Sequence, residues 1–166
     1  DLIPDPRAKG TPAEWTAQQQ FLDQVEASIA DIHNAINAMR KVKKQVEAYN
    51  EMLKAHDSYK ELVETGKSLI KKMEVWESNL IETRQKNFQD VINWPSKLNA
   101  EYFQLLGVAD ASEPAVTQGA RDRYNDLQKL WGQYKSDLDN LVSKDVAAFN
   151  AKFKEMNVPA LVVEKK

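Results

Sequence analysis

Apolar residues recur along the first third of the chain at alternating steps of three and four, after one initial step of seven. They are Trp15, Leu22, Val25, Ile29, Ile32, Ile36 and Met39. On a helix, such steps gather the apolar side chains into one narrow seam, which must pack against partner helices. The pattern therefore predicts a long helix over residues 11 to about 54.

Both ends of this helix carry further signals. Thr11 suits the N-cap position, Pro12 the first helical position, and Glu14 completes a capping box. Residues 1–10 hold two prolines and are expected to be extended. After residue 39 the seam shifts by three residues, which is compatible with local overwinding, a bend or a broadened seam.

The same rhythm returns in a second segment, at residues 62, 66, 69, 73, 76 and 80. A capping box beginning at Ser58 predicts the start of this helix, and Pro95 predicts its end near residues 91–94. Gly66 lies on the seam and marks either a close approach between helices or a weak point. A third, short helix is expected from Pro95, with Gly107 as its C-cap.

A last long helix is expected from Pro114 or Thr117 to Asn157. Its seam is Ala120, Tyr124, Leu127, Trp131, Tyr134, Leu138 and Leu141. Residues 143–145 indicate a bend, and residues 160–164 form a short, strand-prone tail. Three long helices with short connections fold back on one another. We therefore predict an all-α fold: an elongated antiparallel up-down-up three-helix bundle with an additional short helix at one end. Residues 1–10 are a linker, 11–157 the bundle and 158–166 an extended tail.

Composition narrows the classes of function. The 166 residues include 23 basic and 25 acidic side chains, giving a net charge of −2 without a concentrated basic face. That balance argues against nucleic acid as the main partner. The chain has no cysteine, which excludes disulfides and thiolate chemistry. No apolar run reaches 18 residues, so we expect no transmembrane segment.

The pattern predicts no catalytic, cofactor-binding or metal-ligating residue. The two imidazoles, His33 and His56, lack a glutamate three residues earlier, as a helical carboxylate metal site would require. The five glycines are too far apart for a phosphate-binding loop. Pairs of acids occur at helical spacing, which is typical of a solvated face.

Two groups of residues are candidates for contact with a partner. Arg40, Lys41, Lys43 and Lys44 form the densest basic run, which suits an anionic partner or a membrane surface. An exposed helix face paired with glutamates is the favoured interpretation. Trp94, in an Asn-Trp-Pro turn, is the one tryptophan suited to stacking on a sugar, although capping the end of the core is favoured. Trp76 and Trp131 lie on seams and are expected in the core.

The order of these signals resembles a known family. The resemblance rests on residues 4–7, 32–40, 92–95, 145–150 and 157–160. It is to the C-terminal helical region of large bacterial exported proteins with N-terminal β-propellers of BNR (Asp-box) or sortilin-like repeats, often labelled glycosyl-hydrolase-like. The resemblance implies an exported location and an upstream β domain as partner, with self-association as a further option. It carries no catalytic residue onto this segment.

The favoured function is therefore a non-catalytic structural or interaction domain of a larger exported protein. The upstream propeller would carry any binding or hydrolase activity. A carbohydrate-binding or carbohydrate-processing module is the alternative, and it needs exposed aromatics beside carboxylates. A third hypothesis is a helix bundle that binds a membrane surface through residues 40–44.

Overall fold

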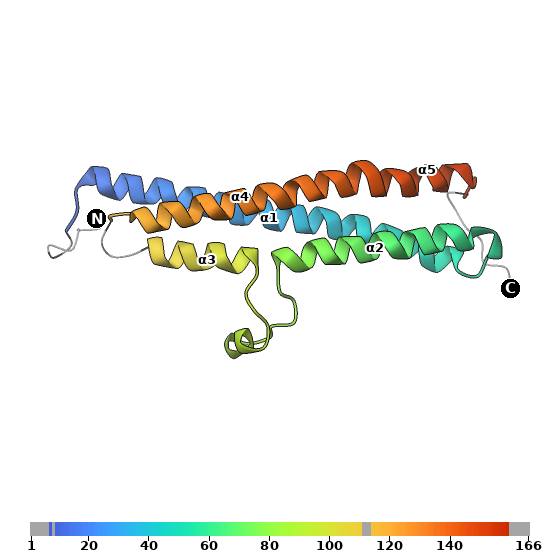
Figure 1. The fold of residues 1–166 in the computed structure, drawn as a ribbon, viewed down its shortest axis with the longest axis horizontal. Helices are drawn as coiled ribbons and strands as arrows, with labels where there is room; N and C mark the ends of the chain where they lie inside the picture. Colours follow the sequence, from blue (N-terminus) through green and yellow to red (C-terminus); the bar gives the residue numbers. More distant parts are fainter. Residues whose placement is uncertain (1–6, 8, 111–113, 160–166) are drawn as a thin grey trace, which may run out of the picture. The chain divides into compact units, whose positions relative to one another are not determined.

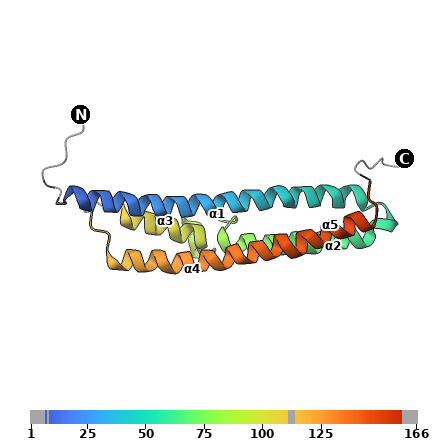
Figure 2. The same ribbon diagram turned by 90° about the horizontal axis from the view of Figure 1, so that it is seen from above.

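The computed structural model describes residue 7 and residues 9–110 and 114–159. These residues form a helical bundle without any strand (Figures 1 and 2). In order, the elements are α1 (Pro12–Leu53), η1 (Asp57–Tyr59), α2 (Lys60–Leu80), η2 (Phe88–Ile92), α3 (Leu98–Ala109), α4 (Gln118–Asn140), η3 (Leu141–Val146) and α5 (Ala147–Glu155). The all-α bundle predicted from the seams is confirmed, and the up-down-up arrangement stays a prediction.

The chain divides into two compact units. The first contains the chain through Asn34 together with Leu80–Gly132, and the second contains Ala35–Asn79 and the chain from Gln133 onward. Helices α1 and α4 each contribute residues to both units, whereas α3 belongs to the first and nearly all of α2 to the second.

The start of α1 has the expected capping box. The Thr11 backbone N–H donates to Glu14 Oε2 at 2.7 Å, and the Glu14 N–H donates to Thr11 Oγ1 at 3.3 Å. These two bonds satisfy helix-terminal N–H groups that would otherwise have no partner. The hydrogen bonds from Thr11 also lower the pKa of Glu14 below its ordinary value.

The first unit packs α1, α3 and α4 around one apolar core (Figure 1). Its buried side chains include Phe21, Val25, Ile29, Ile32, Leu98, Tyr102, Leu105, Leu127 and Trp131. Polar contacts also cross this unit. Trp131 Nε1 donates to Asp31 Oδ2 at 2.9 Å, and Gln128 Nε2 donates to the nearly buried Ser28 Oγ at 2.6 Å. Such part-buried bonds suit only one alignment of α1 against α4.

The second unit packs the C-terminal part of α1, α2 and the last helical segment. Its buried side chains include Ile36, Met39, Val46, Leu53, Leu62, Leu69, Met73, Trp76, Leu141 and Phe149. Trp76 Nε1 donates to the Tyr134 carbonyl oxygen at 2.9 Å. The core positions of Trp76 and Trp131, which are 4% and 1% exposed, are therefore as predicted.

Two positions of the predicted first seam are wrong. Trp15 is 38% exposed and Leu22 is half-buried, whereas Phe21 is buried at 4% exposure. Phe21 takes the inward place because its ring packs edge-on against Tyr124 of α4, with ring centroids 5.5 Å apart. A strict 3.5-residue repeat drifts around a straight helix, so the seam at its first turns runs through positions 18, 21 and 25 instead.

The prediction that the second helix continues to residues 91–94 is wrong, because α2 ends at Leu80. Continuing the alternating steps of its seam would place Thr83 and Asn87 inward, and neither is apolar. With nothing to bury there, helix formation gains no packing free energy. The start is also later than predicted, since the 3₁₀ turn η1 includes Ser58 and α2 begins at Lys60.

The short third helix also differs in its bounds. It begins at Leu98 rather than Pro95, and it continues past Gly107 to Ala109 with Asp110 as its C-cap. Gly107 is therefore inside α3, and it has no positive φ angle. Leu105 and Ala109 are both buried, which favours one further turn of helix beyond the predicted end.

The last helical segment agrees more closely with expectation. Thr117 Oγ1 accepts a hydrogen bond from the Ala120 N–H at 3.2 Å and so caps α4. The irregularity expected at residues 143–145 is a π-helical stretch, η3. The helix ends before Asn157, whose φ of 51° is the left-handed conformation that terminates many helices. The tail at 160–166 and residues 1–6 lie outside the described residues.

Candidate interaction site

A loop over residues 81–97 separates α2 from α3 and carries the short helix η2. Figure 1 draws η2 apart from α3, which belongs to the same unit. Loops that a rigid scaffold positions carry a disproportionate share of binding residues. The loop contains Trp94, which the sequence offered as a candidate for contact while favouring a role in capping the end of the core.

Side chains of the loop fix its backbone around η2. The Asn87 side chain accepts a hydrogen bond from the Gln89 N–H at 3.0 Å. Asp90 Oδ2 accepts from the N–H groups of Lys86 at 2.6 Å and Asn87 at 3.1 Å. Asn87 and Asp90 thus form a capping box that satisfies the start of η2. The turn is specified by its own residues.

Trp94 is half-buried and held on two sides. The Arg84 guanidinium lies 3.8 Å from the centroid of its ring, and the Gln85 side chain donates to its carbonyl oxygen. The Trp94 N–H donates to the Asp90 carbonyl oxygen at 2.8 Å. One face of the ring is therefore occupied by a cation. A sugar could stack on that face only after Arg84 had moved.

Arg84 is itself anchored by Glu82. Its Nε donates to Glu82 Oε1 at 2.7 Å and its Nη2 donates to Oε2 at 2.6 Å. These side-chain bonds, together with one from the Arg84 backbone N–H, lower the pKa of Glu82 from 4.5 to about 2. Because the pKa is lower in the folded loop, the contact favours the folded form above pH 4.5 and loses this effect as the pH falls towards 2.

The tip of the loop is apolar and exposed. Val91 is 45% exposed and Ile92 is 82% exposed, the highest value among the large exposed apolar side chains of the described residues. A single exposed isoleucine is ordinary on a protein surface. Here, two adjacent β-branched side chains are held outward by a turn that the surrounding hydrogen bonds define.

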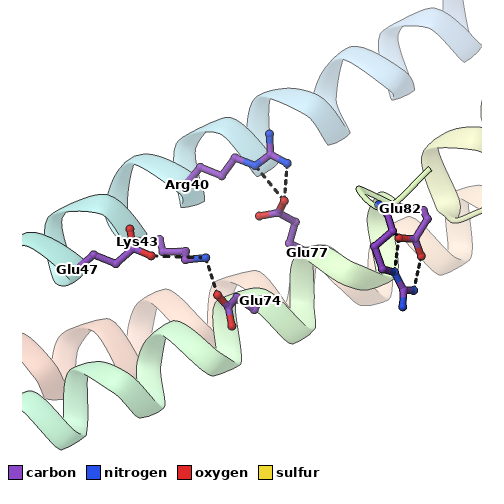
Figure 3. A network of polar contacts seen from close by, with 7 residues as sticks. Arg40, Lys43, Glu47, Glu74, Glu77 and Glu82 are labelled. Carbon is purple, nitrogen blue, oxygen red and sulfur yellow. Dashed lines mark hydrogen bonds and ion pairs between the residues drawn. The ribbon is translucent and has the colours of Figure 1, made fainter. Parts of the chain in front are cut away.

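The predicted basic residues lie in the second unit, on α1, and two of them are paired with glutamates of α2 (Figure 3). Arg40 Nε donates to Glu77 Oε1 at 2.9 Å, and Lys43 Nζ donates to Glu74 Oε1 at 2.6 Å. These hydrogen bonds raise the pKa of both basic groups. Lys41 and Lys44 are exposed. Arg40 and Lys43 are thus half-buried and paired with glutamates, and the role of the basic run in contact with a partner stays a prediction.

The remaining polar features of the described residues do not point to a specific chemistry. Among the residues that the structure describes, no group of three or more His, Asp or Glu side chains could hold a metal ion. His33 is half-buried, and its ring centroid lies 6.2 Å from that of Phe103. In the second unit, a shallow groove of about 570 Å³ runs past Lys72 and Asp145, which form an ion pair at 2.5 Å. Within the described part of the chain, no helix is long and apolar enough to cross a membrane.

Comparison with known proteins identifies no relative that could guide the interpretation of these features. No family model matches the chain, and neither a curated protein nor a solved structure matches it. The relation to the exported propeller proteins thus stays a prediction.

The sequence indicated Trp94 but missed the loop around it. The signals were present: the apolar seam stops at Leu80, and Asn87 and Asp90 have the spacing of a capping box. Because Pro95 is the more obvious helix terminator, the end of the helix was predicted next to it instead. The stacking of Arg84 on Trp94 joins residues ten apart through an irregular turn, and no periodic pattern predicts such a contact.

Proposed function

We propose that this chain is a non-catalytic interaction domain whose helices hold the 81–97 loop in a fixed conformation for contact with a partner. One observation carries the proposal: the loop is braced from within, yet its tip exposes Val91 and Ile92. The export of the parent protein and an upstream β domain remain part of the proposal, and they rest on the sequence resemblance alone.

Carbohydrate binding is the second candidate, since Trp94 is the aromatic that it requires. The cover provided by Arg84 counts against it, because the cation occupies a stacking face of the ring. The two hypotheses differ in their expectation for Arg84→Ala. Uncovering the ring should strengthen sugar binding if Trp94 is a sugar platform, and it should create no sugar binding if the loop serves another contact.

Excising the loop tests whether it serves contact with a partner or is needed for the stability of the fold. We would replace residues 82–96 with a Gly-Ser linker long enough to rejoin α2 and α3. The core of each unit lies in its helices, so the melting temperature should stay within about 4 °C of the unchanged chain, equivalent to about 1 kcal/mol. Circular dichroism at 222 nm measures both helix content and melting. Loss of the cooperative transition would make the loop a structural strut and would refute the proposal.

A further inference from the structure

The exposed tip of the 81–97 loop is convex and small. Val91 and Ile92 are the last two residues of η2, and the backbone N–H groups of the next two residues, Asn93 and Trp94, both donate to the Asp90 carbonyl oxygen. These bonds fix the backbone on the C-terminal side of the tip. The capping box at Asn87 and Asp90 fixes it on the other side. The turn therefore holds the two apolar side chains in exposed positions.

The charges around the tip favour an anionic surface. Both acids of the loop are engaged within it: Glu82 pairs with Arg84, and Asp90 accepts two backbone N–H groups. Lys86 is exposed, and Lys97 lies at the base of the loop, half-buried. Neither lysine ammonium forms an ion pair with the described residues. Lys97 also acts electrostatically on the Glu82 carboxylate, so Lys86 is the loop's exposed cation near the apolar tip in sequence, while the two carboxylates of the loop are already engaged.

Building on the proposed function, we propose that the 81–97 loop inserts Val91 and Ile92 into the interfacial region of an anionic phospholipid bilayer. The exposed Lys86 would lie at the level of the headgroups. A fluid bilayer admits a convex apolar tip without a complementary pocket. A stable protein–protein interface, by contrast, buries roughly 800 Å² on each partner. Two side chains supply little of that area, so a bilayer fits this tip better than a protein surface does.

Vesicle co-sedimentation of the whole chain tests the proposal. Vesicles of phosphatidylcholine mixed equally with phosphatidylserine should bind the chain, and vesicles of phosphatidylcholine alone should bind it less. Ile92→Asp should lower the partition coefficient about tenfold or more, since an isoleucine that would insert into the bilayer is replaced by a charge that the anionic lipid repels. Lys86→Glu should lower it about fivefold or more. Val75→Asp, which changes a 57% exposed valine of α2, should leave binding unchanged.

A fluorescent probe locates the inserted residue directly. Because the chain has no cysteine, Ile92→Cys and Val75→Cys each provide one labelling site for a polarity-sensitive nitrobenzoxadiazole dye. Anionic vesicles should shift the emission at position 92 to shorter wavelength and leave position 75 unchanged. Both residues are exposed, so neither change should alter the fold, and circular dichroism verifies this.

Three results would overturn the bilayer proposal: no vesicle binding by the unchanged chain, equal binding by Ile92→Asp, or equal blue shifts at positions 92 and 75. Self-association that Ile92→Asp abolishes, in a chain that binds no vesicle, would assign the tip to a second copy and also overturn it. None of these results depends on the outcome of the loop excision. Loss of folding on loop excision would refute the interaction function itself, so the two proposals can be refuted separately.

Discussion

Replacing Ile32 with aspartate should unfold the chain or destabilise it by about 4 kcal/mol or more. Ile32 is fully buried in α1, within the core of the first unit. An aspartate there would lose the packing of the isoleucine and would bring a carboxylate away from water without a partner. Since domains of this size are stable by only about 5–15 kcal/mol, such a loss is a large share of the total.

The control is the same chemical change at an exposed site. Val75→Asp should alter the free energy of unfolding by about 1 kcal/mol or less, because Val75 is 57% exposed on α2. Urea unfolding followed by circular dichroism measures both variants. Equal unfolding midpoints for Ile32→Asp and the unchanged chain would mean that the first seam is wrongly assigned.

Replacing Gly66 with leucine should destabilise the chain by about 2–3 kcal/mol. A Cβ atom at Gly66 would lie 2.2 Å from Asn50 Oδ1 and 2.8 Å from Asn50 Cγ, so the Asn50 side chain would have to move from its place between α1 and α2. Gly132→Leu is the matched control, because nothing lies within 4 Å of a Cβ at that helical position. It should stabilise the chain by about 0.8 kcal/mol through helix propensity alone.

The two glycine variants should therefore change stability in opposite directions. Asn50→Ala shortens the side chain that a Cβ at Gly66 would meet, so Gly66→Ala should cost less in that background than in the unchanged chain. A double-mutant cycle with chemical denaturation measures this coupling. A stabilising effect of Gly66→Leu equal to that of Gly132→Leu would show that the helices do not approach closely at Gly66.

The sequence predicts the parts of this fold that depend on periodic burial. The heptad-like steps identify Ile32, Trp76 and Trp131 as core residues because burial on a helix repeats with its turn. The capping box at Thr11 is also predictable, since both of its partners are local. For Gly66, the sequence alone left a close approach and a weak point equally open. Distinguishing them requires Asn50, which is 16 residues away on another helix.

Contacts between distant residues are the part that the sequence does not predict. The basic run at residues 40–44 has the same composition whether it binds lipid or pairs with glutamates. Only the alignment of α1 with α2 brings Arg40 to Glu77 and Lys43 to Glu74. The loop was missed for a related reason. Whether a polar stretch continues a helix depends on what that helix would bury. The composition of residues 81–97 does not show what a continued helix would pack against.

The central claim is that residues 81–97 form a preformed loop, and amide hydrogen exchange measured by NMR tests it most directly. The loop amides that donate hydrogen bonds include the six of Lys86, Asn87, Gln89, Asp90, Asn93 and Trp94. In the free chain, these amides should exchange more slowly than an unstructured chain, and Asp90→Ala should release those of Lys86 and Asn87 first. Exchange of all six at unstructured rates, while the amides of α1 and α2 stay protected, would contradict the account.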